Sequence, residues 1–173
     1  MATERRIELL VISVAVFLVS VAIHTVTVPN IYSDIVSVWH RSEIHSSGLP
    51  YVDFQFEYPV LIGWLLYISN GQGYWLYLTV QAFALAFCAV TMIFALQKLQ
   101  VSSERILIYV IAAPTMLIYG FYNWDLILVA LAMLAIVAIY ARKNRTAGFL
   151  FGLATATKVY SLVFVPVVLA GLK

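Results

Sequence analysis

The sequence predicts an all-α, polytopic transmembrane protein with about five membrane spans. Three observations lead to this fold class. Hydrophobic residues make up 64% of the 173 residues and charged residues only 10%, whereas soluble chains carry roughly a quarter charged residues. The apolar runs are long and continuous, unlike the short alternating segments of a membrane barrel. Finally, the basic residues fall into separate clusters between these runs, which is typical of cytoplasmic loops.

The first apolar run, residues 7–28, is long enough to cross a bilayer core of about 30 Å at 1.5 Å per residue. Arg5 and Arg6 precede it, which indicates a cytoplasmic N-terminus and a retained signal anchor. Pro114 is read as a kink within a later span. Further spans are expected over residues 74–96, 106–122, 126–141 and 146–172.

The last of these segments allows two interpretations. Residues 146–172 are too many for one simple span and too few for two. We favour one broken span, and the alternative is a hairpin of two half-length helices that meet near Lys158. In both cases residues 1–173 form a single transmembrane module.

A polar outer loop, residues 30–73, separates the first two spans and holds four of the eight acidic residues. An amphipathic pattern predicts an interfacial helix over residues 31–45. Residues 51–59 read as an extended strip. Residues 59–69 would be only about 16 Å long as a helix, so we expect a second juxtamembrane helix or re-entrant piece that does not cross.

The charge distribution supports this topology. If the short helix does not cross, every basic cluster falls on the cytoplasmic side and five of the eight acids fall outside. The net charge of +2 is too small to suggest nucleic acid. Cys88 is the single cysteine and lies in an apolar run, so it forms no intrachain disulfide.

Asp34 is the leading candidate for a catalytic residue. It follows the first span on the polar face of the expected interfacial helix, where a partly desolvated carboxylate can act as a general base. The structural alternative is an acid that stabilises a helix N-terminus. Asp53 and Glu57 could complete an acidic cluster with Asp34, or be solvated loop acids.

Lys158 carries a strong signal because ionisable groups within an apolar zone are rare and need partners. A lipid phosphate, or an acid such as Asp125, would serve. Arg41 could be a second phosphate contact. His40 and His45 lack a zinc-ligand spacing, and His24 reads as a packing residue. An interfacial belt explains the clustered aromatic residues, including Tyr58.

Four strings together carry a resemblance to a known family: YSDI, PYVDFQFEYPV, NWDLILVAL and AGFLFGLATATKVYSLVFVP. Their order and spacing resemble the GT-C superfamily of membrane glycosyltransferases, most closely its polyprenyl-phosphate-mannose-dependent branch. The resemblance implies that Asp34 deprotonates an acceptor hydroxyl and that a hexose, mannose above all, passes with inversion from a polyprenyl-phosphate donor. The acceptor would be lipid-linked or another glycan.

The resemblance also implies that Glu57, Asp125 and Lys158 line the site. With them, the candidate substrate-binding positions are Arg41, Asp53, Glu57, Asp125, Lys158 and Tyr160. YSDI has a lone acid where metal-using members have an acidic pair, so no metal or other cofactor is expected. The site would face outward from a plasma membrane, in contact with lipid.

Family members of this kind usually carry further spans beyond the point where this sequence stops. We therefore expect a fragment, a gene-split half or a reduced relative, with a homo-oligomer or a partner subunit to complete it. The alternative function is a non-enzymatic accessory module that binds lipid-linked sugars or a partner subunit.

Overall fold

The computed structural model describes residues 2–26, 31–45, 48–71, 73–164 and 166. This part of the chain is helical and contains no β-strand, only an isolated bridge between Pro50 and Phe54, which confirms the all-α class. The elements in order are α1 (Ala2–Thr25), α2 (Asp34–Trp39), η1 (Ser42–His45), α3 (Val60–Ser69), α4 (Tyr74–Lys98), α5 (Ser103–Ile106), η2 (Leu107–Ile111), α6 (Pro114–Tyr119), α7 (Asp125–Tyr140), α8 (Asn144–Thr157) and η3 (Val159–Phe164).

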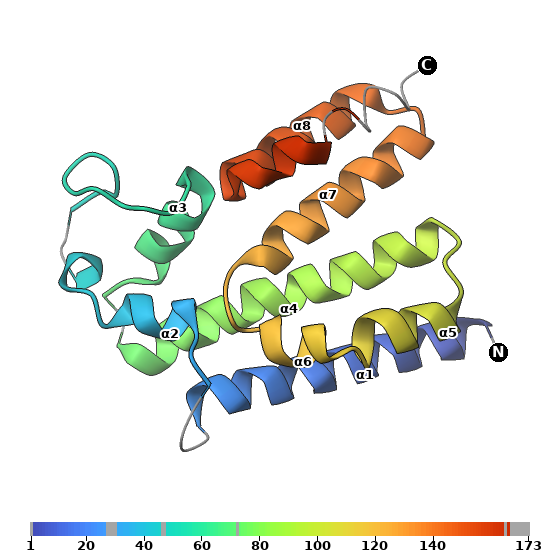
Figure 1. Cartoon of the computed structure of the whole chain (residues 1–173), viewed down its shortest axis with the longest axis horizontal. Coiled ribbons are helices and arrows are strands. Elements are labelled where there is room, and N and C mark those ends of the chain that lie inside the picture. The colour runs from blue at the N-terminus through green and yellow to red at the C-terminus, as the bar shows by residue number, and fades with distance from the viewer. Residues whose placement is uncertain (1, 27–30, 46–47, 72, 165, 167–173) are drawn as a thin grey trace.

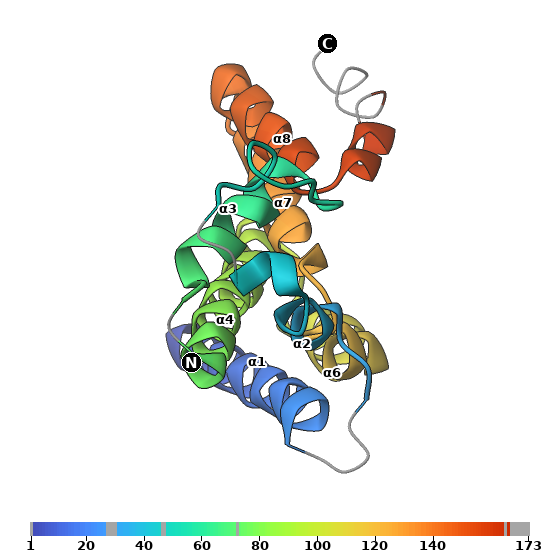
Figure 2. The ribbon, with the colours of Figure 1, turned by 90° about the vertical axis from the view of Figure 1, so that its left-hand side faces the viewer.

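Two long helices, α1 and α4, pack side by side and form the base of the molecule (Figure 1). The row formed by α5, η2 and α6 runs along α1. The antiparallel pair α7 and α8 leans away from α4 towards the top of both views (Figure 2). The small elements α2, η1 and α3 gather at the end where α4 begins.

Two helical stretches, Glu4–Thr25 and Tyr74–Lys98, are long and apolar enough to cross a membrane. Only 28% and 39% of their most apolar windows are buried inside the protein, and large side chains such as Leu18, Phe83 and Phe87 point outward. A core helix of a soluble protein would be mostly buried, so these surfaces fit contact with lipid. We describe the chain as a membrane protein on this basis.

The first of these helices is joined to the rest of the fold by a specific contact. The backbone N–H of Phe121 donates to Ser20 Oγ at 3.0 Å. Gly120 is needed beside it, because a Cβ there would press against the Met116 carbonyl and the Ser20 side chain. Helices α1 and α6 are therefore in close backbone contact. The predicted end of the first span, residues 27–28, lies outside the described residues.

The expected single amphipathic helix over residues 31–45 is wrong. The structure has a six-residue helix, α2, and a separate 3₁₀ turn, η1. The Arg41 N–H bonds the Val38 carbonyl, a three-residue spacing that closes α2 before Arg41. Ile31 precedes α2 and is 44% exposed. Asp34 and Arg41 consequently belong to different local elements.

The expected extended strip over residues 51–59 is also wrong in its first half. Residues 51–53 form a turn in which Tyr51 adopts a left-handed φ of 68°. Asp53 Oδ2 accepts the Leu49 N–H at 2.6 Å and closes this turn. The short helix that follows is present as α3, and the Tyr51 ring packs against Gly63 within it.

The segment expected as a span over residues 106–122 is interrupted rather than kinked. A π-helical stretch, η2, is followed by a break at Ala112 and Ala113, and α6 starts at Pro114. Proline lacks a backbone N–H and disfavours the helical conformation of the residue before it. Ala113 is accordingly extended, with φ −65° and ψ 140°.

The final segment reverses direction at Lys158. Helix α8 ends at Thr157, and Lys158 has an extended backbone with φ −154° and ψ 129°. The Thr155 and Ser161 hydroxyls are hydrogen-bonded at 2.8 Å, whereas six residues of continuous helix would separate them by about 9 Å. The described part of this segment therefore matches the hairpin alternative rather than the favoured broken span. Residues 167–172 lie outside the described residues, and the span boundaries stay a prediction.

The basic clusters lie at the end of the molecule opposite to α2 and α3. They occupy the start of α1, the connection from α4 to α5, and the connection from α7 to α8, which all lie towards the right of Figure 1. Their members are Arg5, Arg6, Lys98, Arg105, Arg142, Lys143 and Arg145. The outer-loop residues therefore sit at the other end of the bundle from the basic clusters.

Candidate functional site

Asp34 is the first residue of α2 and is half-buried. Its N–H donates to the Tyr122 carbonyl at 2.8 Å. The hydroxyl of Ser33 donates to the Phe121 carbonyl at 2.8 Å and also reaches that of Tyr122. The start of α2 is therefore attached to the connection between α6 and α7, although the sequence separates the two by almost ninety positions.

Tyr58 lies near Asp34, close enough for the charge of the carboxylate to act on the phenol. Burial raises the pKa of Tyr58 well above its usual value, and the nearby charges of Asp34 and Glu57 raise it further. The phenol is therefore neutral at physiological pH. Sequence reasoning missed this partner, because one tyrosine among many aromatic residues gives no signal that it faces an acid.

Arg41 and Glu57 form an ion pair at 2.7 Å, with side chains 40% and 58% exposed. The hydrogen bond to Glu57 raises the pKa of Arg41, and the guanidinium stays charged. Exposed pairs of this kind contribute about 0–1 kcal/mol to stability. The consequence is mainly geometric, since the pair joins the segment that follows α2 to the loop residue before Tyr58.

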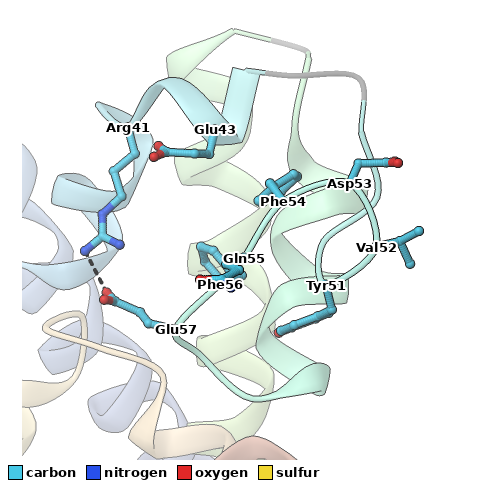
Figure 3. Close-up of a pocket in the computed structure, with 9 residues that line it drawn as sticks. All are labelled: Arg41, Glu43, Tyr51, Val52, Asp53, Phe54, Gln55, Phe56 and Glu57. Carbon is cyan, nitrogen blue, oxygen red and sulfur yellow. Dashed lines mark ion pairs between the residues drawn. The ribbon is translucent and has the colours of Figure 1, made fainter.

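A cavity of about 720 Å³ opens beside this ion pair, between η1 and the segment 51–57 (Figure 3). Arg41 and Glu57 face each other at one side of it. Asp53 points away from the aromatic residues of the segment, in keeping with its bond to the Leu49 N–H. The lining residues are Arg41, Glu43, Tyr51, Val52, Asp53, Phe54, Gln55, Phe56 and Glu57.

A second ion pair joins the start of α7 to the end of α8. Asp125 Oδ1 lies 2.5 Å from Lys158 Nζ, and the side chains are 37% and 21% exposed. Tyr160 lies beside this pair, with the ammonium 5.8 Å from the centre of its ring. Of the two partners considered for Lys158, the structure has Asp125 in place.

Trp124 lies between these two groups and is fully buried. The Tyr58 ring meets it edge-on at 4.8 Å between ring centres. Its indole Nε1–H donates to Gln81 Oε1 at 2.9 Å, and Gln81 Nε2 donates to Ser69 Oγ at 2.8 Å. The sequence signal that points to this network is Gln81, an amide within an apolar span.

Asp125 begins α7, where its own N–H is accepted by Asn123 Oδ1 at 2.9 Å. It also belongs to the lining of a smaller hollow of about 210 Å³ between α4, η2, α6 and α7. Asp125 is the charged member of an otherwise uncharged lining made of Met92, Tyr109, Val110, Thr115, Met116, Tyr119, Gly120, Leu126 and Val129. An apolar hollow thus ends at the Asp125–Lys158 pair.

Asp34, Asp53 and Glu57 do not form a metal-binding cluster. No group of three or more histidine, cysteine, aspartate or glutamate residues lies together within the described part of the chain. The ring nitrogens of His24 lie 2.9 Å and 2.7 Å from the carbonyls of Ile31 and Ile118, a packing role. Metal dependence of the activity stays a prediction.

A comparison with known protein families identifies a match over residues 56–173, to the model described as Glycosyltransferase family 87. No curated protein and no solved structure matches the chain. The matched segment contains Tyr58, Trp124, Asp125 and Lys158, and it begins after Asp34 and Arg41.

Proposed function

The chain belongs to glycosyltransferase family 87 and is a glycosyltransferase, and we propose that it transfers a hexose from a polyprenyl-phosphate donor to a lipid-linked or other glycan acceptor. The observation that carries this proposal is the approach of two charged groups to one buried side chain. Tyr58, which lies near Asp34, packs on Trp124, and Asp125, paired with Lys158, follows Trp124 directly.

Asp34 is the proposed general base. Asp34 is half-buried at the start of α2, at the end of the bundle opposite to the basic clusters. It takes the proton of an acceptor hydroxyl while the acceptor oxygen attacks the anomeric carbon of the hexose. The bond from that carbon to the phosphate oxygen breaks, and polyprenyl phosphate leaves with the bonding electrons. Attack opposite to the leaving group inverts the anomeric configuration.

Lys158 and Asp125 are the proposed donor site. The ammonium is placed to contact a phosphate and to stabilise the negative charge that develops on the leaving group. The adjoining hollow is apolar and borders four membrane-region elements, so it suits the first isoprene units of the donor. Tyr160, whose ring centre lies 5.8 Å from the ammonium, lines the same donor site.

The larger cavity is the proposed acceptor site. Glycan hydroxyls need both donors and acceptors of hydrogen bonds, which Arg41, Gln55 and Glu57 supply along its lining. The rings of Phe54 and Phe56 lie among them and provide apolar faces for a sugar ring. Asp53 closes the turn that shapes this lining. Mannose is the proposed hexose because of the sequence resemblance.

We propose that the site lies on the outer face of a plasma membrane. The basic clusters at the opposite end of the bundle support this orientation, since such clusters favour the cytoplasmic side. Lys158 supplies positive charge at the donor phosphate, so the proposed reaction runs without a metal ion.

Replacing Asp34 by asparagine tests the proposal. The purified protein is assayed in mixed micelles with radiolabelled polyprenyl-phosphate mannose and an octyl mannoside as acceptor probe. Asp34→Asn should lose transfer by about 100-fold or more, because general-base catalysis contributes about 10²–10⁴ in rate. Glu104→Gln, at an exposed position in α5, is the control and should keep wild-type turnover. Wild-type turnover by Asp34→Asn would refute the base assignment.

A further inference from the structure

We propose that Gln81 positions the Asp125–Lys158 pair by holding Trp124, the residue directly before Asp125. This inference rests on the proposed function, because the pair is the proposed donor site. Gln81 belongs to α4, the second of the two apolar stretches that are long enough to cross a membrane. An amide at such a position is costly unless its polar atoms are hydrogen-bonded.

The Gln81 side chain is fully buried and links two other parts of the fold. Its Oε1 accepts the Trp124 Nε1–H at 2.9 Å, and its Nε2 donates to Ser69 Oγ at 2.8 Å. Ser69 is 2% exposed in the last turn of α3, and its hydroxyl lies 2.9 Å and 3.0 Å from the carbonyls of Leu65 and Leu66. A buried chain of hydrogen bonds therefore runs from the connection between α6 and α7, through α4, to α3.

The orientation of the Gln81 amide follows from the chemistry of its partners. An indole N–H can only donate, so the Trp124 indole must face the amide oxygen. The amide nitrogen is then directed to Ser69 Oγ, which accepts while its own hydrogen goes to a carbonyl of α3. A flipped amide would place its nitrogen against the indole nitrogen, with two donors facing each other. The amide therefore has one favoured orientation and holds the indole in one place.

The position of the Trp124 indole is transmitted to Asp125 through a short stretch of hydrogen-bonded backbone. The Trp124 carbonyl accepts the Ile127 N–H at 3.1 Å, and Asn123 Oδ1 accepts the Asp125 N–H at 2.9 Å. Asp125 Oδ1 in turn lies 2.5 Å from Lys158 Nζ. A shift of the indole would therefore displace the carboxylate and the ammonium relative to the donor phosphate.

A purely structural role for Gln81 is the competing explanation. Loss of the amide would then destabilise the fold and reduce transfer by the same factor whether or not the Lys158 ammonium is present. A positioning role predicts coupling between the two residues instead, because Gln81 acts through that ammonium. Once the ammonium has been removed, its misplacement can no longer reduce the rate.

The experiment is a double-variant cycle with radiolabelled polyprenyl-phosphate mannose and octyl mannoside as the probes. Gln81→Met keeps a side chain of similar length and removes both hydrogen-bonding groups. It should lower kcat about tenfold with little change in the KM for octyl mannoside, because a misplacement of about 1 Å can cost up to about 100-fold in rate. In the Lys158→Met background the same substitution should cost less than about twofold.

Two further variants separate positioning from folding. Ser69→Ala removes the group that fixes the amide orientation, so it should cause a smaller loss that also disappears in the Lys158→Met background, and it tests the inference even where Gln81→Met does not fold. Ile93→Val removes a buried methyl group from α4, about 18 Å along the helix from Gln81. It should cost the same factor in both backgrounds. Unfolding of every variant in rising dodecyl sulfate measures stability separately from transfer.

The outcomes distinguish this inference from the proposed function. An equal loss from Gln81→Met in both backgrounds would overturn the positioning role and leave the proposed donor site intact. If Ile93→Val also lost its effect in the Lys158→Met background, the coupling would not be specific to Gln81, and the positioning role would again be overturned. Wild-type transfer by Lys158→Met would instead overturn the proposed donor site, and the positioning role with it.

Discussion

Replacing Lys158 by methionine should reduce hexose transfer by about 100-fold or more, because removing one preorganised electrostatic contact from a developing negative charge costs about 10²–10³ in kcat. Methionine keeps a long unbranched side chain and removes the charge. The loss should appear in kcat with the lipid-phosphate donor, since the ammonium is proposed to act on the leaving phosphate.

The geometry of the Lys158–Asp125 ion pair also gives the effect of Lys158→Met on the stability of the protein. At the observed 2.5 Å between Nζ and Oδ1, two unit charges attract by about 7 kcal/mol at an effective dielectric constant of about 20. Desolvation offsets most of this. Truncating one partner of a fully buried pair costs about 3–5 kcal/mol, and the exposures of 21% and 37% reduce our expectation to about 2 kcal/mol.

The assay is a set of variants measured for transfer and for unfolding in detergent with rising dodecyl sulfate. Lys158→Arg keeps the charge and should stay within about tenfold of wild type. Lys158→Met leaves the Asp125 carboxylate unpaired beside the donor phosphate, so adding Asp125→Asn should recover part of the lost activity. Wild-type transfer by Lys158→Met, or losses that simply multiply in the double variant, would refute this reasoning.

Three further predictions concern the scaffold and the chemistry. Gly63→Ala should destabilise the protein by about 1–3 kcal/mol and slow transfer, because the added Cβ would overlap the Tyr51 ring. The control is Gly148→Ala, in open space on α8, which should be neutral or slightly stabilising in the same unfolding assay. Trp124→Phe and Gln81→Leu should each lower the free energy of unfolding by about 1–3 kcal/mol, because each leaves the other partner of a buried hydrogen bond unsatisfied. The double variant should lose clearly less than the sum of the two, and an additive loss would contradict this. Chelation of divalent metals by EDTA should leave transfer unchanged, and a loss restored by added Mg²⁺ or Mn²⁺ would show that the reaction needs a metal.

The contact between Lys158 and Asp125 was within reach of sequence reasoning. A cation in an apolar zone requires an anionic partner, and few acids lie on the same side of the predicted membrane. The sequence could not choose between a lipid phosphate and Asp125, since that choice depends on where the chain reverses. The reversal at Lys158 brings the ammonium to the start of α7.

The short helix that does not cross the membrane is a second feature that could be predicted, because its apolar segment is short. A piece of about 15 Å is too short for a bilayer core of about 30 Å, and the structure has the ten-residue helix α3 there. By contrast, the effect of Pro114 was misjudged. A proline in a span can be accommodated by neighbouring helices, and sequence alone does not say whether the helix bends or stops.

The contacts of Tyr58 and Trp124 were beyond sequence reasoning. Tyr58 looks like a member of an aromatic belt, and such a belt explains the pattern adequately. Its packing on Trp124 depends on the path of the loop, in which the Tyr51 hydroxyl donates to the Tyr58 carbonyl. Contacts that are set by the path of a loop, rather than by the periodicity of a helix or strand, cannot be predicted from the spacing of residues.

The distance between the proposed base and the proposed donor site is determined by a short stretch of backbone. Asp34 is bonded through its N–H to Tyr122, and Asp125, the partner of Lys158, is only three residues further along. Trp124 within that stretch is anchored by Gln81 and contacts Tyr58. The distance between base and leaving group therefore depends on the connection between α6 and α7 rather than on how α1 and α8 lie in the membrane. Helix movements that leave residues 122–125 intact should preserve the reacting geometry, because both charged groups are attached to the same four residues.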